Sequence, residues 1–221
     1  MAPGRRLDDS LNLSRFFKDT VEKAPAAELL RFKSEGAYSS LSRNEVASRA
    51  ASYASFLLTK GIGSGDHVGI VAAKSPASLF ALFGIFSAGA VAVPLAEELP
   101  AEELQFLFSD ADLKLVFAGK EFVEKAQKAA GDRPVFPLEE VPLESKHDYS
   151  VSGAGCDDTA CLIYTSGSTG TSKGVMLTHR NFISNALCFN RLIEASASDV
   201  LMSILPYWHS FALTVELFGI L

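Results

Sequence analysis

Residues 75–96 read SPASLFALFGIFSAGAVAVPLA, without a single charged side chain. The stretch is long enough to cross a bilayer as one helix. The residues that typically start and end secondary-structure elements favour instead a shorter buried helix followed by a buried strand. Ser75 with Pro76 is typical of a helix start, Gly89 of a helix end, and the four residues before Pro94 fit a short strand. A membrane helix would have to tolerate Pro94 and two internal glycines, so we predict a helix and a parallel strand.

Elements of the same two kinds alternate along the rest of the chain. Apolar spacing and turn residues predict helices over 12–23, 42–61, 100–109, 120–130 and 181–194, strands over 68–71, 113–117, 159–164 and 200–205, and a hairpin over 28–39. The helix from residue 42 opens with a capping box, Ser42 and Glu45. Residues 131–158 read as a loop-dominated link. Strand–helix–strand units with apolar strands predict an α/β fold, a mostly parallel sheet flanked by helices.

Composition narrows the class of protein. The 221 residues are 48% hydrophobic and 21% charged, which is typical of a globular chain. The formal net charge of −6 argues against sequence-independent nucleic-acid binding. Three cysteines without a C-x-x-C pair argue against a disulfide scaffold and favour the cytoplasm. The amino-terminal residues show no apolar core of a secretory signal.

The segment with the clearest chemistry is residues 164–174, YTSGSTGTSKG, which follows a predicted strand. Glycines let the backbone turn tightly, hydroxyls add hydrogen-bond donors, and Lys173 supplies a positive charge, which together suit a polyphosphate. The segment is not a Walker loop, because Ser172 and Gly174 stand where Gly and Ser or Thr are required. Nor is it G-x-G-x-x-G, because Thr169 stands two residues after Gly167. The alternative, a flexible linker, leaves the embedded lysine unexplained.

Three stretches resemble the adenylate-forming superfamily, which comprises acyl-CoA synthetases, luciferases and peptide-synthetase adenylation domains. Residues 165–174 resemble its signature phosphate loop, and residues 38–95 resemble its first subdomain. Residues 205–211, LPYWHSF, resemble its Pro-aromatic-aromatic-His segment beside the carboxylate pocket. Where the family often has Pro before the lysine, this chain has Ser172, which makes the loop less rigid. The resemblance implies the N-terminal part of an acyl-CoA or acyl-carrier-protein synthetase.

The resemblance implies ATP-dependent activation of a carboxylic acid to an acyl-adenylate and transfer to a thiol. ATP with Mg²⁺, and CoA or phosphopantetheine as acceptor, would be required, and no metal-ligating side chain is assigned. Trp208 and His209 would border the acid, with His209 as the catalytic residue. The residues implied for the ATP phosphates are Thr165, Ser166, Gly167, Ser168, Thr169, Gly170, Thr171, Lys173 and Gly174.

The resemblance also implies a domain organisation. Residues 1–150 would form the first α/β subdomain and residues 151–221 the start of the second, with the C-terminal lid domain absent. The apolar ending over 211–221 reads as a cut through a buried helix, so we expect a truncated chain that is inactive alone. The apolar surroundings of Trp208 favour a fatty acid. We expect peripheral membrane contact at most.

Two other functions stay open on the sequence: a non-catalytic nucleotide-binding module, and a membrane-anchored protein that uses residues 75–96. Individual residues also have structural interpretations. His209 could be satisfied structurally, and Trp208 could be a core residue. We expect His179 to be a structural residue at a helix start capped by Thr178, and Cys188 to be buried and inert.

Overall fold

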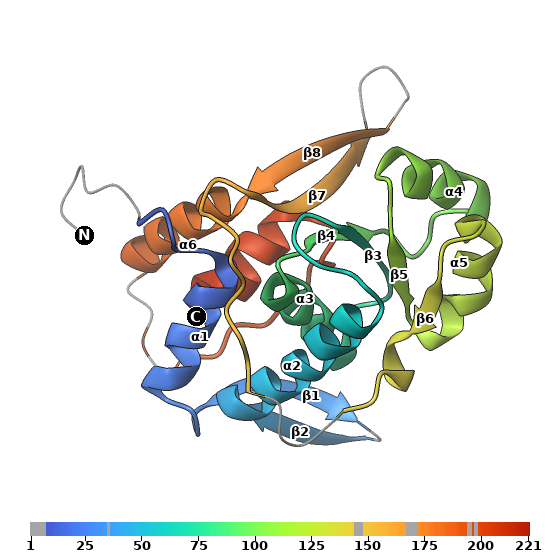
Figure 1. Ribbon diagram of the computed structural model, residues 1–221. Coiled ribbons are helices and arrows are strands. Elements are labelled where there is room, and N and C mark those ends of the chain that lie inside the picture. Colours follow the sequence, from blue (N-terminus) through green and yellow to red (C-terminus); the bar gives the residue numbers. More distant parts are fainter. Residues whose placement is uncertain (1–7, 35, 144–147, 167–171, 194–195, 197–198) are drawn as a thin grey trace.

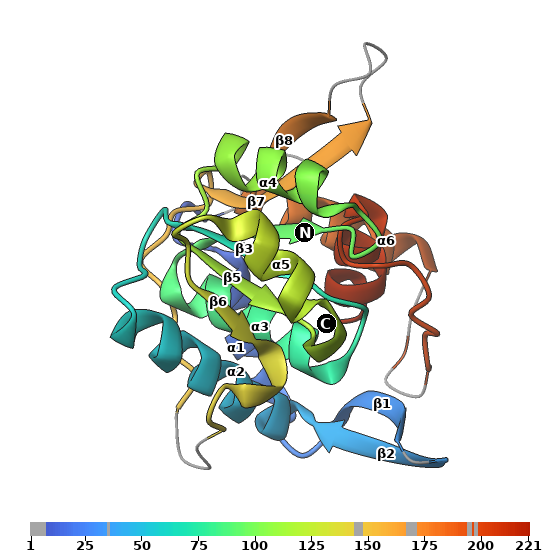
Figure 2. The same ribbon diagram turned by 90° about the vertical axis from the view of Figure 1, so that its right-hand side faces the viewer.

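The computed structural model describes residues 8–34, 36–143, 148–166, 172–193, 196 and 199–221. A six-stranded sheet in the order β6-β5-β3-β4-β7-β8 lies between layers of helices (Figure 1, Figure 2). A separate antiparallel pair is formed by β1 (Glu28–Ser34) and β2 (Ala37–Ser42). The predicted α/β class, with a mostly parallel sheet flanked by helices, is confirmed.

Five of the six strands in the large sheet run parallel, and β8 is antiparallel to β7. The strand bounds are β3 (His67–Val71), β4 (Val91–Leu95), β5 (Leu115–Ala118), β6 (Val135–Pro137), β7 (Thr159–Ser166) and β8 (Ser172–Thr178). The strands β7 and β8 lie beyond residue 150 but pair into the same sheet as β4. The division into two subdomains at that residue stays a prediction.

Helices cover both faces of the sheet, which explains why its inner strands are apolar throughout. On β5, Leu115 and Phe117 join the core on one face, whereas Val116 and Ala118 join the core on the other. The first core is covered by α1 (Leu13–Lys23), α2 (Arg43–Thr59), α3 (Pro76–Ala88) and α6 (His179–Ile193), and the second by α4 (Ala101–Asp110) and α5 (Val123–Ala130).

The uncharged stretch divides into α3 and β4, as predicted. Ser75 caps α3 by accepting a hydrogen bond from the Ser78 N–H, and Gly89 ends it in the left-handed conformation at φ 77°. Gly84 lets α3 pack closely on α2, because a Cβ there would lie 2.5 Å from the Tyr53 Cβ. No helix in the described ranges combines the length and hydrophobicity needed to cross a membrane.

Three details of the strand predictions need correction. The strand β8 was not predicted, and Lys173 therefore lies on a strand rather than in a loop. The three-residue strand β6 falls inside the predicted link. The strand β4 continues through Pro94, which pairs in register with Ile70. Proline has no N–H to donate, and β4 pairs with β7 at Ala92 rather than at Pro94 among the described residues.

The carboxy-terminal part differs more from the prediction. Residues 200–205 form no strand and are largely exposed, with Met202 77% and Ile204 73% accessible. Five apolar residues among these six predicted a buried strand, but the segment has no strand partner among the described residues. Cys188, expected to be buried, is exposed on α6. The chain then buries Leu213 and Phe218 in a π-helical segment (Ala212–Leu217) and a 3₁₀ turn (Phe218–Ile220).

Candidate active site

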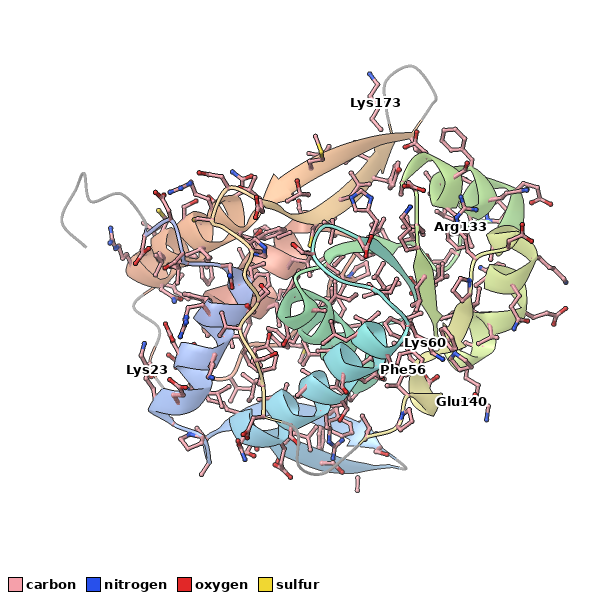
Figure 3. All side chains as sticks on the ribbon, in the orientation of Figure 1. Lys23, Phe56, Lys60, Arg133, Glu140 and Lys173 are labelled. Atoms are coloured by element: carbon pink, nitrogen blue, oxygen red, sulfur yellow. The ribbon has the colours of Figure 1, made fainter. Side chains whose placement is uncertain are left out.

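The predicted phosphate-binding residues lie on the β7–β8 hairpin. Thr165 and Ser166 end β7, Lys173 and Gly174 belong to the start of β8, and Thr165 is the register partner of Lys173. Figure 3 shows Lys173 at the outer end of this hairpin, away from the packed body of the protein. Five of the predicted residues fall outside the described part of the chain: Gly167, Ser168, Thr169, Gly170 and Thr171.

The stem of this hairpin is fixed to a neighbouring helix through Tyr164. Its hydroxyl donates a hydrogen bond of 2.5 Å to the Asp110 Oδ2 on α4. Burial, and then this bond and the charge of Asp110, raise the pKa of Tyr164, so the hydroxyl stays protonated as the donor. Its register partner is Gly174, where a Cβ would lie 2.9 Å from the Leu162 Cδ1 and 3.4 Å from the tyrosine ring. The glycine therefore leaves room mainly for the Leu162 side chain, with the ring beside it.

The other end of β8 passes directly into α6. The Thr178 hydroxyl accepts a hydrogen bond from the Asn181 N–H, and the Asn181 side chain accepts one from the Thr178 N–H, which makes a reciprocal cap. Buried His179 accepts a hydrogen bond from the Leu13 N–H at 3.1 Å. Burial lowers the pKa of His179 to about 4, against an opposing effect of Asp158. The structural role predicted for His179 is confirmed.

Trp208 and His209 lie in a turn that leads into the last helical segment, not at a strand end. The Trp208 indole N–H donates to the Glu97 Oε2 at 3.3 Å. The exposed His209 ring accepts a hydrogen bond from the Phe211 N–H at its Nδ1, 3.2 Å away. In the neutral ring the proton is then on Nε2, from which it can be donated to an anion.

A largely buried ion pair, not predicted from the sequence, lies beside this turn. The Lys74 ammonium lies 2.7 Å from the Glu216 Oε2, with side-chain exposures of 19% and 9%. Burial alone would raise the pKa of Glu216, but hydrogen bonds from Lys74, Ser203 and the Leu205 N–H hold it below its ordinary value. Glu216 is therefore ionised at neutral pH.

These groups lie at the same edge of the sheet. Lys74 follows β3, Glu97 follows β4, and Ser166 ends β7, and all three strands are parallel. Ala92 of β4 pairs with Cys161 of β7, and Glu97 and Ser166 each lie five residues further along the chain from this pair. Glu97 and Ser166 are therefore level with each other. The carboxyl edge of a parallel sheet is where α/β proteins bind ligands. A charged residue two or three positions after a buried strand is the signal that could have identified Lys74 and Glu97.

The structure thus gathers the hairpin and the Trp208–His209 turn at one edge, without a direct bond between them among the described residues. The Gly/Ser/Thr segment offers donors to phosphates, and the His209 Nε2 offers one to a second anion. Among the described residues, no group of three or more His, Cys, Asp and Glu side chains could hold a metal ion.

Comparison with known proteins agrees with this geometry. The sequence profile of the family described as AMP-binding enzyme matches residues 17–221. Zwittermicin A synthase ZmaJ of Bacillus cereus is 28% identical over 88% of this chain and 36% of its own length. The medium/long-chain-fatty-acid–CoA ligase FadD6 of Mycobacterium tuberculosis is 26% identical over 98% of this chain and 37% of its own.

A solved structure matches as well. The ATP-bound MatB from Rhodopseudomonas palustris is 27% identical, with a TM-score of 0.83 over 95% of this chain and 43% of that protein. The chain therefore spans less than half the length of these three proteins. Because the family profile extends over almost the whole sequence, the chain belongs to the AMP-binding enzyme family, whose members form adenylates.

Proposed function

We propose that the protein activates a carboxylic acid with ATP and passes the acyl group to a thiol, the chain described here supplying the phosphate loop and part of the acid site. In the first step, a carboxylate oxygen attacks the α-phosphorus of ATP, and pyrophosphate leaves. In the second step, a thiol sulfur attacks the acyl carbon of the adenylate, its proton is lost, and AMP leaves. CoA and a carrier-protein phosphopantetheine are the two candidate thiols.

The observation that carries this proposal is the hairpin stem at the carboxyl edge of the sheet. Thr165 and Lys173 face each other across the two strands, so the ends of the intervening Gly/Ser/Thr segment are held together. A loop with fixed ends loses less conformational entropy when it binds a ligand. Thr165, Ser166 and Lys173, with the residues between them, would hold the β- and γ-phosphates.

The second anion, the acid, belongs beside Trp208 and His209. Bringing two anions together requires donors and positive charge at the point of contact. The His209 Nε2–H would donate to the carboxylate or to the α-phosphate, while the indole, held by Glu97, would line the pocket. We favour a fatty acid as the substrate, supported by the apolar side chains of the turn and by the relative named as a fatty-acid–CoA ligase.

Magnesium would arrive bound to ATP. Carboxylates usually help to hold Mg²⁺ at phosphate sites, with waters and phosphate oxygens completing its shell. In the described part of the chain, no group of three or more His, Cys, Asp and Glu side chains could hold a metal ion on its own. We assign no residue of this chain to the metal and no chemical step to it.

Acid-dependent exchange of labelled pyrophosphate into ATP tests the proposal in the complete gene product. The acids compared should be fatty acids of short, medium and long chain, together with a set of amino acids. The proposal predicts exchange that depends on an acid, with the highest kcat/KM for a fatty acid. Exchange with an amino acid would overturn the substrate assignment. ATP binding without any acid-dependent exchange would favour the non-catalytic nucleotide-binding module.

A further inference from the structure

Residues 199–211 approach the sheet edge without forming a helix or strand of their own before His209. Apolar burial does not hold the first part of this segment, because Val200, Met202 and Ile204 are 72%, 77% and 73% exposed. Past this exposed part, Tyr207 packs against the core, and polar groups around Glu216 and Glu97 give the turn with Trp208 and His209 further points of attachment.

Glu216 fixes the start of the segment. Its carboxylate accepts hydrogen bonds from the Lys74 ammonium at 2.7 Å, the Ser203 hydroxyl at 2.8 Å and the Leu205 N–H at 3.1 Å. Two of these three donors belong to the segment itself. The carboxylate therefore joins residues 203–205 to the helical segment that follows them.

Lys74 joins the same cluster to the sheet. Its ammonium also donates to the Leu205 carbonyl at 2.6 Å and lies 4.8 Å from the centre of the Tyr207 ring. Lys74 comes directly before the cap of α3, three residues after the end of β3, so its backbone is fixed by the core. Its charge is already compensated by Glu216, which leaves little attraction for a phosphate.

We infer that Lys74 and Glu216 are positioning residues, a clamp that holds the turn with Trp208 and His209 against the acid site. Glu97, after the neighbouring strand, supplies the second point of attachment through the indole N–H. The role of the clamp in acid binding rests on the proposed function. Its effect on the position of Trp208 can be tested without that assumption. Breaking a buried ion pair by removing one partner leaves an unpaired charge, which makes the clamp sensitive to single substitutions.

The 221 residues contain one tryptophan, so in a protein limited to them all tryptophan fluorescence comes from Trp208 and reports on the clamp. The variants are Lys74→Met and Glu216→Gln, with Lys74→Arg as the conservative change. The clamp predicts a red-shifted emission and stronger quenching by acrylamide in the first two, with partial recovery in Lys74→Arg. The matched control is the exposed pair Lys128 and Glu124 on α5, changed to Met and Gln.

Kinetics separate positioning from a general loss of structure. In the complete gene product, Lys74→Met and Glu216→Gln should raise the KM for the acid about tenfold, with the KM for ATP unchanged. Circular dichroism of each variant checks that the fold is retained. Unchanged Trp208 fluorescence in both folded variants would overturn the clamp. The clamp would also be overturned by altered fluorescence with an unchanged KM for the acid. The same holds if the Lys128 and Glu124 variants change fluorescence and KM as much as the Lys74 and Glu216 variants do. Wild-type protein without acid-dependent exchange would contradict the proposed function instead.

Discussion

The two hairpins of this protein have the same local plan and different attachments. Each passes from its second strand directly into a capped helix: β2 into α2 at Ser42, and β8 into α6 at Thr178. The β1–β2 hairpin forms a sheet of its own, whereas β7 pairs with β4 and is tied to α4 through Tyr164. The hairpin with the Gly/Ser/Thr segment is thus the one built into the central sheet. A rigid scaffold is what a ligand-binding loop needs.

The largest expected difference between the hairpins is in the use of ATP. Both carry an exposed lysine near the turn, Lys33 on β1 and Lys173 on β8. Lys173→Ala should lower kcat/KM for ATP by about 10²–10³-fold, because a fixed positive charge on the phosphates is lost. Lys33→Ala should leave it unchanged. Equal effects of the two substitutions, measured by pyrophosphate exchange, would contradict the assignment of the loop.

The next difference concerns pH and the helix that follows β8. His179 has a pKa of about 4 in the folded protein and an ordinary value of 6.5. Between these values the unfolded chain binds more protons, so the free energy of unfolding falls as the pH drops from about 6.5 to about 4. The loss attributable to His179 is about 3 kcal/mol.

Urea unfolding of wild type and His179→Asn across pH 4–7 measures this difference. Asparagine keeps an acceptor for the Leu13 N–H but does not titrate. Its stability should therefore depend less on pH over this range. The helix after the other hairpin, α2, should respond to pH differently. Hydrogen bonds from Ser42 lower the pKa of the exposed Glu45, so the cap of α2 is weakened only as the pH falls below about 4.5. Parallel pH profiles for wild type and His179→Asn would show that the buried ring is not the cause.

A smaller effect should come from the tyrosines of the two hairpins. Tyr164→Phe removes a hydrogen bond to a carboxylate and should lower the free energy of unfolding by about 1.5 kcal/mol. Tyr38, the register partner of Lys33, is 77% exposed. Tyr38→Phe should have no measurable effect. Equal denaturation midpoints for the two variants would show that Asp110 does not help to hold the β7–β8 stem.

The smallest effect is expected at the helix caps. Asn181→Ala removes the side-chain partner of the Thr178 N–H and should cost about 1 kcal/mol. The matching change at α2, Glu45→Ala, should cost a similar amount, because both caps are reciprocal. If only one of the two variants loses stability, the two caps have similar geometry but do not contribute equally to the free energy of unfolding. Thermal unfolding of both variants gives the comparison.

The sequence predicted those parts of the fold that depend on local signals. The start of α3 at Ser75 and its end at Gly89 follow from capping chemistry and from the freedom of glycine at positive φ. The β1–β2 hairpin and the capping box at Ser42 were also predicted correctly. These features depend only on residues a few positions apart in the chain, so they can be predicted from a single sequence.

What escaped prediction depends on distant contacts. The edge strand β8 exposes Val175 and Met176, so it lacks the alternation of a half-buried strand. Residues 200–205 are apolar enough for a core strand but find no partner in the sheet. Lys74 and Glu216 meet across 142 residues, and no local pattern connects them. The resemblance pointed to residues 165–174 and to the Trp208–His209 turn as site candidates, but not to the groups that attach this turn to the sheet.

The central claim, that the β7–β8 hairpin binds the ATP phosphates, is tested most directly by hydrogen exchange with and without saturating MgATP. Phosphate binding by this hairpin predicts slower amide exchange over residues 165–174 when ATP is bound. It predicts unchanged exchange over residues 28–42, the hairpin with the same plan and no attachment to the central sheet. Unchanged exchange over 165–174, under conditions that saturate pyrophosphate exchange, would contradict it.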